Sequence, residues 1–531
     1  MGELSSQASN AIMYVTYGAL LVSGCYIGWR ARDGISFLSS NGTQKALPLS
    51  LNFIASAMGC GILTTYSQIA NTAGLHGLLV YCICGSLPIF LFSFAGPAIR
   101  KRCPDGFVLT EWVRMRFGVI CSLYLSAFTV LTMFLFLVGE ISALNYAVST
   151  LTGLNALPAI IVECVVTTIY TSIGGFKVSF ITDNLQALMV TLLLVICACG
   201  MGTNIHIDTS LIGSSGLLKE NKLGWQLIYI LFVAIVTNDC FMAGFWLRTF
   251  AAKTDKDLLI GTGIAAVVTF VYCALVGTTG FIAVWTGDLQ PNDPDGYAAF
   301  FILLAKMPSW VIGFVLVFTV CLSTCTLDSL QSAMVSTISN DLFRNKISLY
   351  WVRAMVVVII IPCVVVGVKA ADDVLQIYLI ADLVSSAIIP IIFLGLSEKF
   401  YWLAGVDVIV GGLGALLAVF VFGTVYYDNA RDGARLLLLW NGLYNSEDWG
   451  PFGAFVIAPF GGVIIGFFSC AVRLASLKVY SRVTGKPFTA LDRPIPQLQA
   501  AAEAQSDSSE EDVVFSNDGA DYESVSYTSK K

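Results

Sequence analysis

Long runs of apolar residues alternate along this sequence with short polar and charged segments. A membrane-spanning helix needs about 20 predominantly apolar residues, and stretches of about that length recur from Ala11 onward. The pattern predicts an all-α polytopic membrane protein of about thirteen transmembrane helices. The predicted spans are 11–29, 47–71, 75–98, 120–149, 157–173, 178–201, 225–247, 258–284, 309–340, 352–369, 374–396, 403–425 and 452–474.

The composition supports a membrane protein. Of 531 residues, 56% are hydrophobic and only 12% are charged, and the mean hydropathy is +0.79, which is too apolar for a soluble globular chain. Almost all of the 15 cysteines fall inside apolar runs, as expected of small buried hydrophobes rather than disulfides. His76 and His206 are too few for a multi-His metal site. We expect no cofactor and no nucleic-acid partner.

Basic residues mark alternate loops. If the N-terminus lies outside, the inner loops carry most of the lysines and arginines and the outer loops few, as the positive-inside rule requires. The sequence thus predicts an outside N-terminus and a cytoplasmic C-terminus. The basic residues of the predicted inner loops are Arg30, Arg32, Lys45, Arg100, Lys101, Arg102, Arg114, Arg116, Lys177, Arg248, Lys253, Lys256, Arg344, Lys346, Lys399, Arg473, Lys478 and Arg482.

Two predicted spans are interrupted. Residues 55–61 place small residues and two glycines in the middle of the second span, and residues 236–240 place Asn238 and Asp239 inside the seventh. Unwound backbone at membrane depth is tolerated where it lines a cavity. The interruptions lie five spans apart, as in two inverted five-helix repeats whose broken first helices build a site at the midplane. Close helix packing through small residues is the alternative for Gly59.

A polar half distinguishes the predicted ninth span. From Ser323 onward hydroxyls recur at nearly every turn, and Asp328 lies among them. A charge at membrane depth costs roughly 2.5–3.5 kcal/mol on insertion scales and normally faces a protein interior or a wet cavity. The segment therefore indicates a solute or ion pathway. The alternative is that the hydroxyls bond back to their own helix or to neighbouring helices.

These features divide the chain into six predicted segments. Residues 1–46 form an N-terminal extra span and an inner loop, 47–201 the first repeat, 202–224 an outer loop, 225–396 the second repeat, 397–484 the extra C-terminal spans and inner end, and 485–531 an acidic cytoplasmic tail. The tail is polar and lacks a further span, so we expect it to be disordered.

The segment Ser172–Gln186, SIGGFKVSFITDNLQ, resembles the most characteristic motif of the solute:sodium symporter family, with the Gly-Gly pair, Thr182, Asp183 and Gln186 in the expected places. Weaker similarities occur at Trp246–Lys253 and Ser339–Phe343. The resemblance implies a leucine-transporter-like fold, alternating access driven by a cation gradient, and a location in the plasma membrane.

The resemblance also implies a cation site between the second and ninth spans. Its ligands would be the carbonyl oxygens of Ala55, Met58 and Leu322 with the side chains of Cys325 and Thr326, and Asp183 would lie near the inner exit of the ion path. The family usually has serine where this chain has Cys325, and a thiol is a poor ligand for a hard cation. Either Thr326 and the carbonyls suffice, or Ser323 and Thr324 are the true pair, or coupling is to protons.

Within the family, the nearest similarity is to fungal and plant urea and polyamine transporters, which carry acids in the fourth and seventh spans. Glu140 and Asp239 match these positions loosely, and a carboxylate in a cavity suits an amide or ammonium donor. The predicted substrate-binding residues are Ala57, Glu140, Asn238, Asp239 and Asp328.

Sodium-coupled symport of urea or a polyamine is thus the favoured function. The partners would be a small polar solute, a monovalent cation and the lipid bilayer. Proton-coupled symport of an amino acid, a sugar or another nutrient is one alternative. A transporter-fold sensor or channel is another. A membrane hydrolase or acyltransferase is disfavoured because the two histidines lie in unsuitable contexts.

Overall fold

The computed structural model describes residues 5–30, 40–104, 106, 108–344, 346, 348–369, 374–443 and 445–492. Side chains at 174–177, 193, 349, 352, 353 and 356 are outside this description. Three sequence predictions therefore fall outside it: the inner-loop charges Arg32 and Lys177, and the disordered tail from residue 493 onward.

The described residues are helical apart from loops and one isolated β-bridge between Gln44 and Ala252. In the described part of the chain, ten helices are long and apolar enough to cross a membrane. The shorter apolar segments 46–57, 157–173 and 357–369 overlap the second, fifth and tenth predicted spans. The helices are α1 Ser6–Arg30, α2 Ala46–Ala57, α3 Ile62–Arg102, α4 Leu109–Phe117, α5 Val119–Thr152, α6 Leu157–Asn204, α7 Thr209–Ser214, α8 Lys222–Phe241, α9 Ala243–Ala251, α10 Asp255–Trp285, η2 Pro294–Ala298, α11 Ala299–Leu304, α12 Ser309–Asp341, α13 Leu349–Lys369, α14 Val374–Leu394, η3 Glu398–Phe400, α15 Gly405–Tyr426, α16 Ala430–Leu436 and α17 Gly450–Thr484.

The second predicted span is broken where its small residues predict. Helix α2 ends at Ala57, Met58 has extended backbone angles (φ −111°, ψ 93°), and α3 begins at Ile62. The first turns of α3 complete this span, and non-helical Gly74 divides it from the third. The break leaves carbonyl groups at the end of α2 and N–H groups at the start of α3 without helical partners.

The seventh predicted span is also broken, but later than the sequence suggested. Residues 236–240 remain helical, and the break falls at Met242 (φ −71°, ψ 116°) between α8 and α9. The indole Nε1 of Trp246 donates to the carbonyl of Cys240 at 2.7 Å. This side chain satisfies a backbone carbonyl that the break releases, and Asn238 and Asp239 themselves do not interrupt the helix.

Helix α6 joins the fifth and sixth predicted spans in one helical run of 48 residues. At 1.5 Å per residue this is about 72 Å of helix, which exceeds a single crossing. Both parts contact α12, through Glu163 in the first and Asp183 in the second. The sequence predicted a short inner loop at the join, where the structure has helix.

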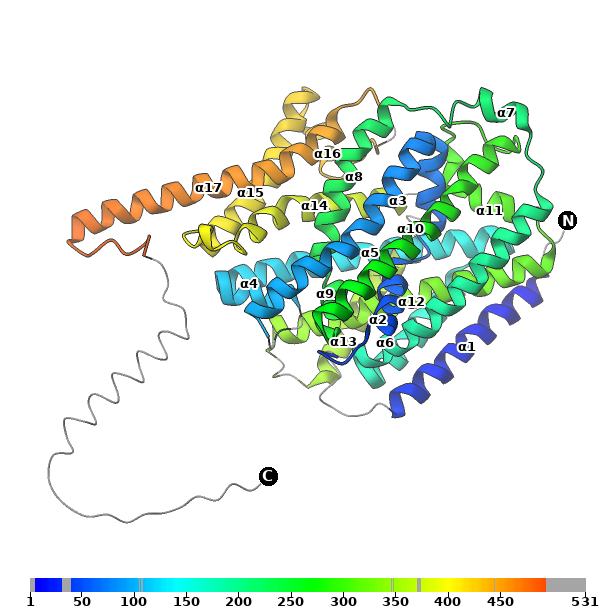
Figure 1. Cartoon of the computed structure of the whole chain (residues 1–531), viewed down its shortest axis with the longest axis horizontal. Helices are drawn as coiled ribbons and strands as arrows, with labels where there is room; N and C mark the ends of the chain where they lie inside the picture. The colour runs from blue at the N-terminus through cyan, green and yellow to red at the C-terminus, as the bar shows by residue number, and fades with distance from the viewer. Residues whose placement is uncertain are drawn as a thin grey trace, which may run out of the picture. The chain divides into compact units, whose positions relative to one another are not determined.

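Helix α12 lies at the centre of the bundle. Of its most apolar window, 78% is buried, the highest share of any candidate span in the described part of the chain. It packs against α1, α2, α5, α6, α9 and α13 (Figure 1). Its hydroxyl-rich half therefore faces protein on several sides, and different faces of it meet different partners.

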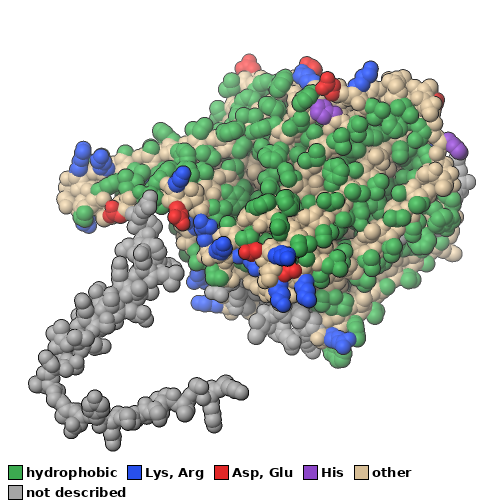
Figure 2. Space-filling view, in the orientation of Figure 1, with side chains coloured by type: hydrophobic (Ala, Val, Ile, Leu, Met, Phe, Trp, Pro, Cys, Tyr) green, Lys and Arg blue, Asp and Glu red, His purple; other side chains and the backbone are tan. Residues whose placement is uncertain are grey.

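Hydrophobic side chains dominate the outer surface. Figure 2 shows them across the middle of the visible face, with Lys and Arg gathered mainly along its lower edge. Large side chains such as Val15, Ile120 and Phe468 are 69–76% exposed, which suits contact with lipid.

Among the described residues, those within 5–396 and 403–472 form one compact unit, and those within 397–402 and 473–492 form a second. Within the second unit the guanidinium Nη2 of Arg473 donates to the carbonyl of Trp402 at 2.7 Å. The hydroxyl of Tyr401 donates to the carbonyl of Leu491 at 3.1 Å.

Close packing of α10 on α3 makes a testable prediction. A Cβ at Gly280 would overlap the backbone carbonyl of Ser67, whereas a Cβ at Gly263 on the same helix would have 3.8 Å of clearance from Phe90. Gly280→Ala should lower the unfolding free energy by about 1–3 kcal/mol through overpacking. Gly263→Ala should be neutral or slightly stabilising because alanine favours helix. Thermal unfolding of the two purified variants in detergent checks this, and equal melting points would contradict it.

Candidate substrate cavity and cation junction

A cavity of about 150 Å³ lies where both helix breaks meet. Its walls come from α2, α3, α5, α8, α9, α12 and α14. Four of the predicted substrate-binding residues line it, namely Ala57, Glu140, Asn238 and Asp239. The Oδ1 atom of Asn238 is buried without a hydrogen-bond partner among the described residues.

Glu140 is held by the first helix break. One carboxylate oxygen accepts the backbone N–H of Cys60 at 2.7 Å, and the other accepts the hydroxyl of Tyr378 at 2.7 Å. A Cβ at Gly59 would overlap this carboxylate, so glycine is needed for the close approach of backbone and acid. Glu140 therefore satisfies freed backbone at the start of α3, where a negative charge is favourable, as well as facing the cavity.

Two other carboxylates in the cavity have no such support. Asp239 on α8 and Asp382 on α14 both line it and interact electrostatically with each other. No hydrogen bond from the described residues reaches either side chain. Two like charges without donors are unfavourable in a partly buried space, so this part of the cavity is suited to a cationic group.

Aromatic side chains form much of the remaining wall. Tyr66 and Tyr81 stack with ring centroids 4.3 Å apart, and Phe136 lies 4.8 Å from Tyr378. Phe245 completes this set. Aromatic faces attract ammonium groups when water is excluded.

The predicted cation ligands converge beside the cavity. The Thr326 hydroxyl donates to the carbonyl of Met58 at 3.1 Å and lies 3.3 Å from that of Leu322. The Cys325 sulfur lies 3.5 Å from the carbonyl of Ala55. We call this set, Ala55, Met58, Leu322, Cys325 and Thr326, the α2–α12 junction.

The donor set fits a small monovalent cation through its oxygens. Three carbonyls and one hydroxyl are the ligands that hard cations prefer, and the Cys325 thiol is the exception. Ser323 and Thr324, the alternative pair, do not face α2. Thr324 contacts Glu163 on α6 instead, and Ser323 also acts electrostatically on that carboxyl.

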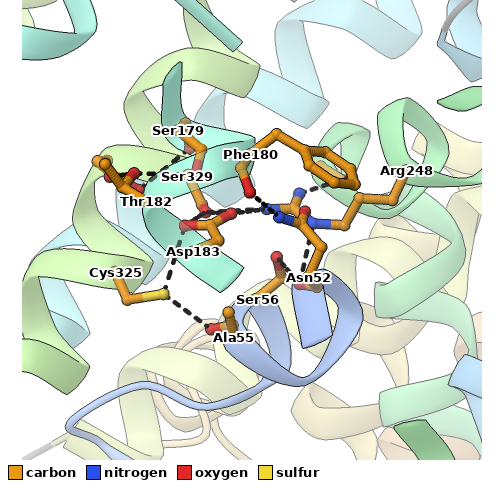
Figure 3. Close-up of polar contacts among 12 residues, drawn as sticks. Asn52, Ala55, Ser56, Ser179, Phe180, Thr182, Asp183, Arg248, Cys325 and Ser329 are labelled. Atoms are coloured by element: carbon orange, nitrogen blue, oxygen red, sulfur yellow. Dashed lines mark hydrogen bonds and ion pairs between the residues drawn. The ribbon is translucent and has the colours of Figure 1, made fainter. Parts of the chain in front are cut away.

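Asp183 lies in a buried ion pair. The guanidinium Nη2 of Arg248 is 2.7 Å from an Asp183 oxygen, and both side chains are fully buried (Figure 3). The same guanidinium donates to Ser329 at 2.9 Å and to the carbonyls of Asn52 and Gly244 at 3.2 and 2.9 Å. Arg248 thereby connects α9 with α2, α6 and α12.

Arg248 is not the inner-loop charge that the sequence predicts, since it lies within α9 and is 0% exposed. Its partner Asp183, the predicted exit-path residue, also contacts the Cys325 thiol at 3.4 Å. The signal available was Asp183 itself, since a carboxylate at membrane depth requires a partner.

Asp328 is not brought to the cavity. It lies on another face of α12, where its carboxylate accepts hydroxyls of Tyr170, Ser179 and Thr182 on α6 at 2.5, 3.2 and 3.3 Å. These bonds satisfy the acid, so its position gives no contact with a solute in the cavity. Asp382 and Glu163 are buried acids that sequence reasoning missed, although each is the lone acid in an apolar run.

A curated transporter resembles this chain over nearly its whole length. No family model matches the chain. The spermidine transporter DUR31 of Candida albicans is 68% identical over 496 residues, which cover 93% of this chain and 95% of that protein. The chain belongs to the solute:sodium symporter family. It is therefore a secondary active symporter and not an enzyme.

More distant members match shorter stretches. Probable urea active transporter 2 of Schizosaccharomyces pombe is 29% identical over 162 residues, 30% of this symporter and 23% of that protein. The urea-proton symporter DUR3 of rice (Oryza sativa subsp. japonica) is 25% identical over 174 residues, 33% of this symporter and 22% of that protein.

Solved structures share the leucine-transporter-like fold. A Na⁺-coupled sialic acid symporter in a substrate-bound outward-open state aligns with a TM-score of 0.66 over 88% of this symporter and 97% of that chain, at 16% identity. The nucleobase-cation symporter Mhp1 in a closed conformation aligns with a TM-score of 0.55 over 83% and 96%, at 13% identity. The predicted fold class is confirmed.

The Arg248–Asp183 pair yields a stability prediction. Asp183→Asn should reduce the unfolding free energy by about 3–5 kcal/mol because it leaves a buried guanidinium uncompensated. Asp432→Asn is the control, since its pair with Arg435 is 37–42% exposed and should matter by less than about 1 kcal/mol. Denaturant titration in detergent measures both. A similar loss of unfolding free energy in the two variants would show that the buried ion pair contributes no more to stability than the exposed one.

Proposed function

We propose that this symporter imports a cationic polyamine, with spermidine as the representative, together with a monovalent cation held at the α2–α12 junction. The observation that carries the proposal is the pairing of Asp239 and Asp382 on one cavity without donors of their own. Among the described residues that line this cavity, Arg248 alone is basic, and its charge is engaged by Asp183. The cavity therefore presents a net negative surface.

A polyamine matches this surface in two ways. Its ammonium groups are donors for Asp239 and Asp382, and charge-assisted hydrogen bonds of this kind are stronger than neutral ones. Its methylene segments and remaining ammonium charge suit the wall formed by Tyr66, Tyr81 and Phe136. The 68% identity to a protein named as a spermidine transporter supports the same substrate class.

Urea is the second candidate. Relatives named as urea active transporters match this chain at 22–29% identity over about a third of its length. The Asn238 side chain and the carboxylates offer acceptors for urea N–H groups. A neutral solute, however, leaves the charges of Asp239 and Asp382 unbalanced, which favours the polyamine.

Coupling follows from the position of Thr326. This residue lines the cavity and also donates to the Met58 carbonyl, so cation and solute share one boundary. A cation at the junction ties α2 to α12 and orders the cavity wall. Each ligand then raises the affinity of the other equally, by about 1–3 kcal/mol. We place the protein in the plasma membrane with an outside N-terminus and a cytoplasmic C-terminus.

The test of the function is uptake by cells or proteoliposomes that contain the full chain. Labelled spermidine, urea, proline and a hexose are compared while Na⁺ and pH are varied independently. Saturable, cation-dependent spermidine accumulation against its gradient supports the proposal. Accumulation of urea with no spermidine uptake would replace it by the second candidate, and equilibration without accumulation would indicate a channel.

Neutralising one cavity carboxylate should weaken solute binding selectively. Asp239→Asn or Asp382→Asn should each raise the apparent Kd for spermidine by roughly 10-fold to 100-fold, the loss of a hydrogen bond to a charged group. The apparent cation affinity should change less. Asp295→Asn, at an exposed position in η2, is the control. Unchanged spermidine binding in both cavity variants would assign the two acids to structure.

Thr326→Ala should remove cation dependence. The substitution deletes the hydroxyl at the junction without adding bulk, so the protein should reach the membrane while uptake no longer responds to the coupling cation. Thr278→Ala, at an exposed hydroxyl on α10, serves as the matched control. The uptake rate of each variant is measured as a function of the coupling-cation concentration. A wild-type dependence for Thr326→Ala would reject this ligand assignment.

A further inference from the structure

A second buried acid lies on the far side of α12 from the cavity. Glu163 on α6 is 1% exposed, and its Oε2 atom has no hydrogen-bond partner among the described residues. Its Oε1 atom lies 3.2 Å from the Thr324 hydroxyl oxygen. A carboxylate buried in this way is costly unless it is protonated or bound to a cation.

The hydrogen-bond geometry favours a protonated Glu163. The Thr324 hydroxyl is 2.6 Å from the carbonyl of Val320, one turn earlier on α12. A threonine has one hydroxyl hydrogen, so its donation to Glu163 at 3.2 Å is shared with the shorter contact to the carbonyl. A buried carboxylate with so little support favours its protonated form.

No basic residue is near enough to balance the charge. The titratable groups that act on Glu163 or on its immediate neighbours are all acids, phenols or thiols in the described part of the chain. They are Tyr17 on α1, Cys60 at the first helix break, Glu140 on α5, Cys164 on α6, Cys321 on α12 and Cys363 on α13.

Hydroxyls surround the acid. The phenolic oxygen of Tyr17 is buried without a hydrogen-bond partner among the described residues and acts electrostatically on Glu163, and the Ser323 hydroxyl interacts with the Glu163 carboxyl. Thr319, also unpartnered, lies one turn before Ser323 on the same face of α12. Buried acids and hydroxyls arranged in this way form proton relays in transporters.

The acid is linked to the cavity through the first helix break. Glu163 and Glu140 interact electrostatically, and Glu140 accepts the N–H of Cys60 at that break. A change of charge at Glu163 therefore acts on an acid that lines the cavity. Glu163 is also separate from the α2–α12 junction, since Thr324 rather than a junction residue contacts it.

We propose that Glu163 is the binding site of a proton that is co-transported with the solute. The proton comes from water on the outer side, binds one carboxylate oxygen, and leaves to water on the inner side, so that no oxidant or other reactant is required. Protonation stabilises the packing of α1, α6 and α12 seen here, and deprotonation accompanies its opening. This inference rests on the proposed symport and names a second coupling ion for it.

The experiment uses the full chain in proteoliposomes, with equal Na⁺ on both sides and the membrane potential clamped at zero by an ionophore. Spermidine counterflow is measured first, because exchange requires binding and alternating access but no net proton movement. Accumulation is then driven by an inside-alkaline gradient of one pH unit. One proton per solute allows about tenfold accumulation.

Glu163→Gln mimics the protonated acid and should retain counterflow while accumulation falls to simple equilibration. Thr324→Val removes the hydroxyl that donates to the Glu163 carboxylate, so it should shift the pH for half-maximal accumulation about 0.5–1 unit higher, the scale of one hydrogen bond. Glu220→Gln, at an exposed loop position, should behave as the wild type.

Three experimental results distinguish failure of the proton site from failure of the proposed function. Wild-type counterflow without accumulation driven by the pH gradient overturns the proton site and leaves the proposed function standing. Accumulation by Glu163→Gln at the wild-type level, or an unshifted pH profile for Thr324→Val, also overturns it and makes Glu163 a permanently protonated structural acid. Absence of spermidine counterflow in the wild type rejects the proposed function itself.

Discussion

Two helices stop in the interior of this protein, and the backbone groups that they release must find partners where water is scarce. The side chains that provide those partners also build the site. Glu140 accepts the N–H of Cys60, Thr326 donates to the Met58 carbonyl, and Trp246 donates to the carbonyl of Cys240. Satisfying the broken helices therefore brings an acid and a hydroxyl to one cavity. The side chains that satisfy the backbone groups of the broken helices therefore also supply polar groups to the cavity.

The Arg248–Asp183 ion pair neutralises one buried acid and leaves the acids of the cavity unneutralised. Asp183 lies 3.4 Å from the Cys325 thiol, and as a free carboxylate it would be a strong cation ligand at the edge of the α2–α12 junction. The guanidinium neutralises it and holds three helices around it. In the proposed mechanism, a coupling cation would rely on carbonyls and the Thr326 hydroxyl, while the unbalanced negative charge would be left to Asp239 and Asp382. This separation would allow cation and solute to bind without competing for one carboxylate.

The sequence was sufficient for features that depend on length and local chemistry. Apolar run lengths predicted the spans, and Gly59 and Gly61 located the first break, where Glu140 approaches closely at Gly59 and Tyr378 at Gly61. The prediction for the second break was wrong because Asn238 and Asp239 stay helical and the helix ends three residues after Asn238. Arg248 was predicted to be a loop charge because its position at the end of an apolar run does not reveal its distant partner, Asp183. Helical periodicity predicted that Asp328 and Thr326 lie on different faces of α12. It could not identify the neighbouring helix that each face contacts.

The charge of the cavity bears on how the transport cycle is driven. Each elementary charge that moves through a membrane potential contributes roughly 2.3 kcal/mol per 100 mV. In the proposed cycle, a polyamine would carry its own positive charge inward, and a cation at the junction would add to it. After release, the cavity would return with the unpaired charges of Asp239 and Asp382, and a potential that is negative inside would favour their outward movement. The same two acids would then serve both halves of the cycle, since they would attract the solute from outside and help to return the empty site.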